Sequence, residues 1–396
     1  MVGTGSSGGS RRTGGIAEIV VAGAGPVGLA AALLLDRLGY AITLVAPERT
    51  NTDGRTSALL AGSVALLQRI GVWQDAEKEA APLRSLRIVD ATRRLIRAPE
   101  VLFYAAEIGL DAFGYNIPNR ALLATLDAAV LGRTIKRRSA TVEALDLAGG
   151  DVTAHLSDGG HLSAPLIVAA DGRRSLVRNA VGIETLDWRY DQSALVVNFR
   201  HSLAHDDTST EFHAESGPFT MVPLPGNCSS LVWMDRPAES EARARLGPEA
   251  LSAEIEERSA AILGAVEVEG LAQVFPLAGM NAQRFAAKRA VLIGEAAHLF
   301  PPIGAQGLNL GYRDVATLGR LLAGPLPDPG AADVLAAYDR ARRSDIVGRT
   351  AAVDALNRTL LSDFLPVQAA RGLGLFLLDQ IPPLRRAIMR QGVGAT

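Results

Sequence analysis

Short apolar runs, each followed by glycine, organise the first part of the chain. The apolar run at 16–22 predicts a β-strand, and the segment after the glycines of 23–28 has the spacing of a helix that Gly39 ends. Residues 41–45 predict the next strand. A strand, a glycine turn, a helix and a second strand in this order are typical of a dinucleotide-binding α/β fold.

The middle of the chain extends this unit. The expected elements, in chain order, are a loop and then a helix in 54–73, strands at 83–91 and 93–104, a helix at 120–130 capped by Asn119, a hairpin of 141–147 and 152–156, a turn at 158–160, and a buried strand at 165–170. The last of these strands ends in Asp171-Gly172, a second place where a turn follows directly on an apolar run.

Residues 186–283 have a different pattern. Hydrophobic and polar residues alternate there as in an antiparallel sheet, and 248–263 has helical spacing. Because no nucleotide-type turn occurs in this part, we interpret it as a substrate lobe. The expected division is a flexible tail at 1–15, a discontinuous nucleotide-binding domain of 16–82, 115–185 and 284–355, a substrate domain of 83–114 and 186–283, and a C-terminal helical segment of 356–396.

The stretch 290–313 is the most informative part of the chain. It begins with an apolar run that predicts a buried strand, and it ends in a segment that should open a helix. Between them lie Pro301, Pro302, Gly304 and Gly307. Prolines fix the backbone and glycines let another molecule approach it, so N–H groups at the start of the helix would face a phosphate or an electron-rich ring. We therefore interpret the stretch as a ligand-binding loop.

Composition narrows the function classes. The chain has 396 residues, 48% of them hydrophobic and 21% charged, which is enough for two lobes with a sizeable core. A net charge of −2 argues against a nucleic-acid partner. The single cysteine, Cys228, permits no disulfide within the chain and fits a reducing compartment. The histidines lack metal-ligand spacing, so no metal is expected, and without an apolar run long enough for a membrane span we expect a cytoplasmic protein.

The C-terminal end allows two interpretations. Leucines and phenylalanines after residue 356 are mixed with Arg371, Arg385, Arg386 and Arg390. They form either a helical hairpin packed on the body with solvated arginines, or an apolar and basic surface on the inner face of the cytoplasmic membrane. Such a surface would admit a lipid-soluble substrate.

Each glycine of the first turn has a separate expected role. Gly23 permits the tight turn, Gly25 lets a pyrophosphate approach the backbone, and Gly28 lets the helix pack on the strand. An acidic residue for the ribose hydroxyl is expected at the end of the second strand, but Ala46 stands there and Glu48 follows two residues later. Either Glu48 reaches the ribose or this hydrogen bond is absent, and we favour Glu48.

Three motifs stand in the order seen in the class A flavoprotein aromatic hydroxylases. They are the Gly23–Gly28 turn, Asp171-Gly172, and Gly294-Glu295 with the loop that follows. Beyond that class, the chain resembles the ubiquinone-biosynthesis hydroxylase family. The likeness is carried by RTSAL at 55–59, NRALL at 119–123, ADGRRS at 170–175 and, above all, GEAAHLFPPIGAQGLNLGYRDV at 294–315. It covers nearly the whole chain from 16 to 390.

The resemblance implies a Rossmann-like FAD-binding lobe, an antiparallel-sheet substrate lobe and C-terminal helices. The FAD pyrophosphate would lie on the first glycine turn, Arg55 and Arg120 would face the cofactor, and Asp171 would support the FAD and nicotinamide side. Glu295, after Gly294, would bond the ribityl chain where the family usually has Asp. A set of loop residues would direct N–H groups at the pyrimidine edge of the flavin: Pro302, Gly304, Gln306, Gly307, Leu308 and Asn309.

The implied reaction needs no conspicuous catalytic side chain. NAD(P)H, bound transiently, would reduce the flavin, O2 would add to give a C4a-hydroperoxide, and this species would hydroxylate an electron-rich phenol. His298 either orients the loop or shuttles a proton, and the first role is the more common one for a single histidine. Some residues at alternating positions of the predicted sheet should line the pocket beside the ring: Phe212, Phe219, Met221, Pro223, Leu224 and Trp233.

The leading hypothesis is an FAD-dependent NAD(P)H monooxygenase that hydroxylates a polyprenylated phenol in ubiquinone biosynthesis. The alternatives are a related hydroxylase of a soluble phenol or secondary metabolite, and a non-catalytic flavoprotein subunit of a biosynthetic complex. Subunits of such a complex and a peripheral membrane contact stay open as partners. A yellow protein that consumes NAD(P)H faster with a phenol present would not be a mere scaffold.

Overall fold

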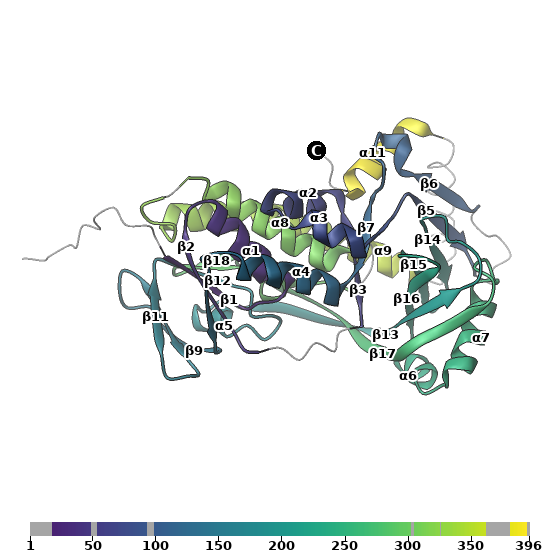
Figure 1. The fold of residues 1–396 in the computed structure, drawn as a ribbon, viewed down its shortest axis with the longest axis horizontal. Helices are drawn as coiled ribbons and strands as arrows, with labels where there is room; N and C mark the ends of the chain where they lie inside the picture. The colour runs from purple at the N-terminus through teal and green to yellow at the C-terminus, as the bar shows by residue number, and fades with distance from the viewer. Residues whose placement is uncertain are drawn as a thin grey trace, which may run out of the picture.

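Two lobes lie side by side along the long axis of the molecule (Figure 1). The computed structural model describes residues 18–48, 54–92, 99–301, 305–324, 326–361 and 381–393. Two long antiparallel strands, β13 (Thr185–His201) and β17 (Val266–Ala282), run from one lobe into the other. The expected fold class, a Rossmann-like lobe with a second sheet lobe, is confirmed.

The nucleotide lobe is built on a six-stranded sheet in the order β18-β19-β12-β1-β2-β8. Its strands are β1 (Glu18–Ala22), β2 (Ala41–Ala46), β8 (Lys136–Ser139), β12 (Leu166–Ala169), β18 (Ala286–Ala287) and β19 (Ala290–Leu292). All neighbours pair in parallel except β18 and β19. Strands β12 and β19 are buried at every residue, because both of their faces are covered, and this is why they occur as continuous apolar runs.

Helices pack on this sheet. They are α1 (Pro26–Arg37), α4 (Asn119–Leu131), α5 (Leu176–Ala180) and α8 (Gln306–Leu321). The expected hairpins are confirmed as β9 (Val142–Asp146), β10 (Val152–Leu156) and β11 (His161–Ala164). The prediction that Asn119 caps α4 is wrong. Pro118 holds that position, and Asn119 Oδ1 instead accepts a hydrogen bond from Ser57 Oγ at 2.6 Å.

A small three-stranded sheet in the order β3-β7-β4 lies between the two larger ones (Figure 1). It consists of β3 (Thr56–Leu60), β7 (Gly114–Pro118) and β4 (Ala81–Pro82). Between β3 and β4 the chain forms α2 (Ala61–Ile70), α3 (Trp73–Ala76) and η1 (Glu77–Glu79). The prediction of a loop before α2 is therefore wrong for residues 56–60, because they form a strand that pairs with β7. Gly71 ends α2 in the left-handed conformation, as expected.

The second lobe is an eight-stranded sheet in the order β20-β17-β13-β16-β15-β14-β5-β6. Its other elements are β5 (Ser85–Asp90), β6 (Val101–Tyr104), η2 (Ala105–Ile108), β14 (Thr208–Ala214), β15 (Gly217–Leu224), β16 (Cys228–Asp235), α6 (Pro237–Ala244), α7 (Pro248–Arg258) and β20 (His298–Leu299). The sheet is antiparallel except that β5 and β14 pair in parallel. The helix expected over 248–263 ends at Arg258, and of the strand expected at 93–104 the part 93–98 lies outside the described residues.

The two faces of this sheet have different neighbours. On one face, which we call the back face, alternate residues of four central strands form a buried cluster with Leu251 and Ile255 of α7. The strand residues of this cluster are Leu195, Val197, Phe199, Phe212, Phe219, Met221, Leu231 and Trp233. The residues between them point to the opposite side. We call that side the front face, and it contacts the nucleotide lobe, because Asn198 Nδ2 donates a hydrogen bond to Gly54 O at 3.2 Å.

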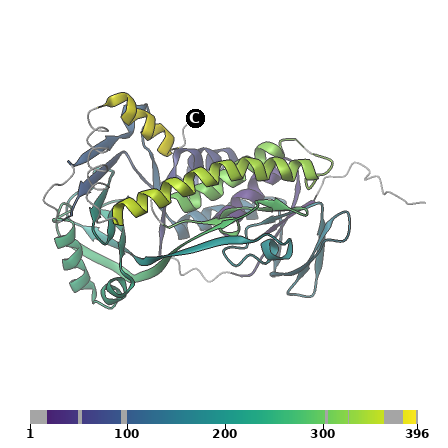
Figure 2. The same cartoon turned by 180° about the vertical axis from the view of Figure 1, so that it is seen from behind.

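The C-terminal part crosses both lobes. Helix α9 (Ala332–Leu361) runs along the molecule in the view of Figure 2, so the boundary expected at 355 falls inside a continuous helix. Helix α11 (Pro382–Val393) packs on β6 through Met389, which is buried against Val101 and Phe103. Arg385 of α11 is buried too, so the interpretation with solvated arginines is wrong for it. Arg371 lies outside the described residues.

Candidate cofactor and substrate site

Of the three glycines in the first turn, Gly23 and Gly28 have no room for a side chain, whereas Gly25 has. Gly23 has φ +108°, and a Cβ there would lie 2.1 Å from Ala170 O. A Cβ on Gly28 would lie 2.0 Å from Gly23 O. A Cβ on Gly25, the residue that precedes α1, would meet no atom within 4 Å. The main chain is thus exposed at Gly25, at a helix N-terminus whose N–H groups favour an anion.

Asp171 lies beside this turn and has an unused acceptor. Its backbone N is 2.9 Å from the position that a Cβ on Gly23 would take. Its Oδ2 accepts from Val177 N at 3.2 Å, while its buried Oδ1 has no hydrogen-bond partner among the described residues. Buried carboxylate oxygens nearly always have a donor, so this atom fits a hydroxyl or amide of a bound group.

The third motif forms a short turn after β19. Residues Gly294–Ala296 form the 3₁₀ turn η3, in which Glu295 is exposed and therefore accessible to a ligand. Gly294 has φ +59° and lies against Val27, which brings this turn next to the first helix. Arg178 joins it to the second motif, because its guanidinium donates to Ala296 O and to Arg173 O, each at 3.0 Å.

The start of α8 follows this turn. Ala305 takes the left-handed conformation with φ 54°, and α8 begins at Gln306. Gly307 leaves open space where a Cβ would stand. Pro302 and Gly304 lie outside the described residues, and Leu308 is half-buried against the core of the nucleotide lobe.

Asn309 uses its side chain within the protein. Its Oδ1 accepts from Leu60 N at 2.9 Å and from Ser63 Oγ at 2.5 Å. Its Nδ2 donates to Ala58 O at 2.8 Å and to Ala305 O at 2.5 Å. Asn309 therefore ties α8 to β3 and α2, and its side chain is fully used inside the protein.

His298 is part of a buried network. Its Nε2 donates to Asp314 Oδ2 at 2.8 Å, and the same oxygen accepts from Gly294 N at 2.8 Å. Both side chains are buried. This geometry supports the loop-orienting role of His298. The sequence interpretation missed Asp314, although it stands in the quoted motif.

The remaining predicted cofactor residues lie at the surface. The Arg55 guanidinium stands over the Phe275 ring at 5.0 Å, which places it between the nucleotide lobe and the front face. Arg120 is exposed in the first turn of α4, and Glu48 is exposed two residues beyond the end of β2. Their contact with a cofactor stays a prediction.

Most of the predicted substrate residues point away from these groups. Phe212, Met221 and Trp233 belong to the back-face cluster beneath α7. Pro223 is buried and shares the parity of Met221, and its carbonyl accepts from Asn116 Nδ2 at 2.9 Å. The structure thus does not bring these four toward Arg55.

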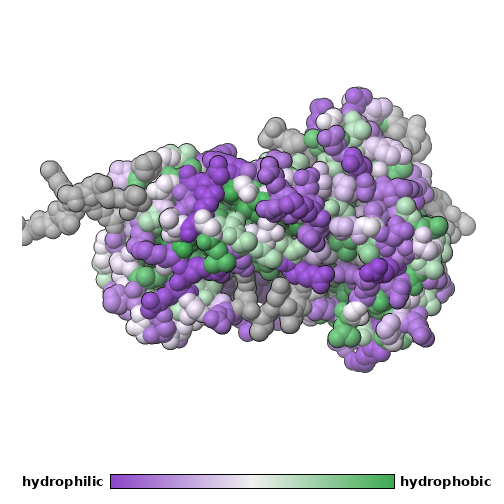
Figure 3. Space-filling model, in the orientation of Figure 1, coloured by the Kyte–Doolittle hydropathy of each residue, from purple (hydrophilic) through white to green (hydrophobic). Residues whose placement is uncertain are grey.

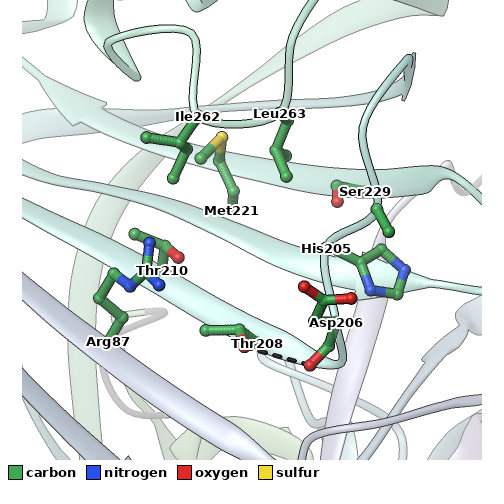
Figure 4. A pocket seen from close by; sticks show the side chains of 10 residues that line it. Arg87, His205, Asp206, Thr208, Thr210, Met221, Ser229, Ile262 and Leu263 are labelled. Carbon is green, nitrogen blue, oxygen red and sulfur yellow. Dashed lines mark hydrogen bonds between the residues drawn. The ribbon is translucent and has the colours of Figure 1, made fainter.

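A cavity of about 130 Å³ also opens on the back face (Figure 4). It is lined by Arg87, Thr210 and Met221 of the sheet and by Ile262 and Leu263, which follow α7; Met221 lies beside Ile262. The sheet separates this cavity from the front face.

The front face carries a row of side chains that are half-buried except for the buried Val196. Strand pairing aligns Gln273, Val196, Val232, Thr220 and Glu211 across five neighbouring strands. Phe275, the partner of Arg55, follows two residues after Gln273 on the same face. The sequence pattern did not indicate these residues, because most residues of the row are polar and a substrate pocket was expected at apolar positions of the sheet.

Together these features fit an FAD. An open glycine turn at a helix N-terminus accommodates a pyrophosphate, and Asp171 offers a buried oxygen that no described residue bonds. Exposed Glu295 and the N-terminus of α8 lie on the turn and helix that follow β19. When bound, the cofactor supplies the redox chemistry that no side chain here can perform.

Comparison with known proteins agrees with this geometry. The family described as FAD binding domain matches residues 17–351. A ubiquinone hydroxylase, UbiL, of Rhodospirillum rubrum is 35% identical, with 96% of this chain and 90% of that protein covered. The 3-demethoxyubiquinol 3-hydroxylase of Escherichia coli is 31% identical, with 95% and 98% covered.

Solved structures share the fold at low identity. The p-nitrophenol 4-monooxygenase PnpA of Pseudomonas putida superposes with a TM-score of 0.77 at 20% identity, covering 96% of this chain and 98% of that one. Klebsiella pneumoniae HpxO, solved with FAD and uric acid, gives a TM-score of 0.76 at 17% identity, with 95% and 96% covered. The fold, the glycine turn and the relatives agree, and the chain belongs to the ubiquinone-biosynthesis hydroxylase family of FAD-dependent monooxygenases.

Proposed function

We propose that this protein hydroxylates the aromatic head of a polyprenylated phenol in ubiquinone biosynthesis, with NAD(P)H as reductant and O2 as the source of oxygen. The observation that carries the proposal is the open turn at Gly25 beside Asp171, whose buried Oδ1 has no hydrogen-bond partner in the part of the chain that the structure describes. The names of the two relatives, a ubiquinone hydroxylase and a 3-demethoxyubiquinol 3-hydroxylase, support the substrate class.

In this proposal the residues of the chain bind and orient the cofactor and the substrate. The N–H groups at the start of α1 hold the pyrophosphate, and Asp171 accepts a hydrogen bond from the cofactor. The N–H groups at the start of α8 would hold the flavin, since a helix N-terminus favours negative charge. Arg55, stacked on Phe275, closes the space between the nucleotide lobe and the front face.

A lipid-soluble substrate is favoured by the surface of α11. Ile381, Leu384 and Ile388 follow helical spacing and are 40%, 41% and 45% exposed. Arg386 and Arg390 are exposed on the same helix, and Figure 3 shows hydrophobic and hydrophilic side chains together in that region, at the upper right. An apolar stripe with flanking arginines suits the surface of an anionic membrane. Among the described residues no helix is long and apolar enough to cross one.

The substrate is tested by quinone analysis in cells that lack the gene, with and without its restoration. We expect a prenylated phenol lacking a ring hydroxyl to accumulate and to disappear on restoration. A normal quinone profile would favour the alternative, a hydroxylase of a soluble phenol. If the purified protein is yellow but no phenol increases its rate of NAD(P)H consumption, the alternative of a non-catalytic subunit is favoured instead.

The membrane contact is tested with vesicles that contain anionic lipids. The variant with Leu384→Gln and Ile388→Gln should co-sediment several-fold less than the wild type, because two exposed apolar side chains are lost. Leu271→Gln is the matched control, since Leu271 is 91% exposed on β17. Equal sedimentation of all three proteins would remove the membrane from the proposal. Retention of other biosynthetic proteins on the wild type alone would identify complex subunits as the partner of α11.

A further inference from the structure

We propose that Glu211 accepts the hydroxyl hydrogen of the phenol on the front face, and that His213 and Thr220 position its carboxylate. This inference rests on the proposed function, because it assigns a residue to the phenol that the proposed function supplies. Glu211 and His213 stand two residues apart on β14, so both side chains point to the front face.

The hydrogen bonds around Glu211 define its orientation. His213 Nε2 donates to Glu211 Oε1 at 2.6 Å, and Thr220 Oγ1 donates to Oε2 at 3.3 Å. His213 is buried, whereas the Glu211 side chain is 25% exposed. Each carboxylate oxygen has two lone pairs, so both retain capacity for a further donor. The carboxylate is thus oriented by two neighbours on the same face of the sheet and is itself partly exposed.

The neighbours of Glu211 suit an aromatic ring. Thr220 lies on the next strand, and Val232 and Val196 follow it on the two strands beyond. Strands are about 4.8 Å apart, so Thr220 lies about 5 Å and Val232 about 10 Å from Glu211 along the row, and a ring bonded to Glu211 would lie over these two side chains. At the far end of the row stand Gln273 and, two residues on, Phe275 beneath Arg55. A ring over the middle strands would therefore lie between Arg55 and Glu211.

The row continues beyond Glu211 toward the C-terminal helix. Ile88 of β5 pairs with Glu211, and Val101 of β6 pairs with Ile88. Both pack in the apolar cluster that Met389 of α11 completes. An apolar tail attached to the ring could thus follow the sheet toward the exposed stripe of α11, with the polar head held at Glu211.

The chemistry follows from the electron demand of the reaction. Attack on a phenol ring by an electrophilic oxygen is faster when electron density on the phenol oxygen increases. A hydrogen bond from that hydroxyl to Glu211 increases it, and as the ring is attacked the proton passes to the carboxylate while the O–H electron pair stays on the phenol oxygen. The oxygen atom comes from O2 reduced with NAD(P)H, and its O–O bond breaks with the electron pair leaving on the second oxygen. The attacked ring carbon then releases its hydrogen as a proton to that oxygen, and Glu211 returns its proton to the phenol oxygen as aromaticity is restored. General-base assistance of this kind contributes about 10²–10⁴-fold to a rate.

The test begins with binding and needs no turnover. The probe is 4-nitrophenol, whose neutral and ionised forms differ in colour, added to the oxidised FAD holoenzyme without NAD(P)H. A carboxylate beside the hydroxyl should hold the neutral form in the wild type, and Glu211→Gln should shift the bound probe toward the ionised form. Identical spectra of the two bound probes, or no binding to the wild type, would overturn the assignment.

Turnover gives a second and independent readout. With the physiological phenol, Glu211→Gln should lower kcat by about 100-fold while KM changes little, with normal flavin content. Glu211→Asp should restore part of kcat, and His213→Gln, which keeps a donor near the carboxylate, should lose less than Glu211→Gln. Glu269→Gln is the matched control, because Glu269 is an exposed carboxylate of the same sheet bound to Arg200.

The two proposals fail differently. If the protein acts on no phenol, the wild type will hydroxylate none, and the proposed function fails together with this assignment. If it hydroxylates a phenol and Glu211→Gln keeps the wild-type kcat, only the role of Glu211 is wrong.

Discussion

The imidazole of His298 donates to the carboxylate of Asp314 at 2.8 Å in the interior of the nucleotide lobe. Arg342 of α9 donates from Nε to the other oxygen of Asp314 at 2.6 Å, and Gly294 N completes the set. One buried carboxylate thus joins the turn after β19 to α8 and α9. The turn Gly294–Ala296 is therefore held by this carboxylate as well as by the left-handed conformation of Gly294.

Removal of the anchor should destabilise the protein strongly. Asp314→Ala would leave the buried Arg342 guanidinium without its main partner, and breaking a buried pair from one side costs about 3–5 kcal/mol. The measurement is urea unfolding of the FAD-free protein. Asp75→Ala, which removes an exposed ion pair with Lys78, serves as control and should leave the midpoint unchanged. A midpoint for Asp314→Ala close to that of the control would show that the network adds no stability.

The same carboxylate should make stability fall in acid. Burial alone would raise the pKa of Asp314, but His298 and Arg342 outweigh it, and the pKa lies below its ordinary value of 3.8. A depressed folded-state pKa gives stability that is present above the unfolded-state pKa and is lost as the pH falls through the folded-state pKa. Urea midpoints between pH 6 and pH 2 should therefore drop more steeply for the wild type than for Asp314→Asn. Parallel curves would contradict this origin of the acid sensitivity.

Features that depend on local sequence could be predicted. Strands β12 and β19 have no polar residue to interrupt them, and Gly23 and Gly28 stand where main chains meet. Such signals depend on a few adjacent residues and on sterics that hold in any context. The nucleotide lobe and the glycine turn were therefore clear from the sequence.

Features that depend on distant partners could not be predicted. Strand β3 exists because Thr56–Leu60 pair with β7, more than fifty residues later, and nothing in the five residues alone indicates this. Alternation groups Phe212 with Met221 on one face, but only α7 decides that this face is the back one. The polar front-face residues Glu211 and His213 gave no sequence signal, because their significance comes from their neighbours in space.

The contact of the C-terminal helix depends on one arginine. Arg385 donates from Nε to Glu107 Oε2 at 2.7 Å and from Nη2 to Oε1 at 2.8 Å, and it stacks on Phe103. This hydrogen-bonded pair holds the pKa of Glu107 below its ordinary value. Arg385→Met should release α11, seen as faster hydrogen exchange of its amides, whereas the exposed Arg386→Met should not.

A double-mutant cycle separates this pair from its surroundings. Combining Arg385→Met with Glu107→Gln should reveal a coupling free energy of about 1–3 kcal/mol, in the range for charge-assisted hydrogen bonds. A coupling near zero would mean that apolar packing of Met389, and not the ion pair, holds α11 in place.

Replacing Gly25 or Gly28 of the first turn by valine should impair the protein for two different reasons: loss of FAD binding and loss of stability. At Gly25 a Cβ meets no protein atom within 4 Å, so Gly25→Val should fold with the thermal stability of the FAD-free wild type. It should nevertheless retain almost no FAD, because the side chain occupies the space in which the pyrophosphate approaches the backbone. At Gly28 a Cβ would lie 2.0 Å from Gly23 O, so Gly28→Val should destabilise the apoprotein itself, by about 3 kcal/mol or more. Flavin absorbance after gel filtration and melting of the FAD-free proteins distinguish the two effects. Normal flavin content in Gly25→Val would sink the pyrophosphate assignment, since no packing defect could then account for the result.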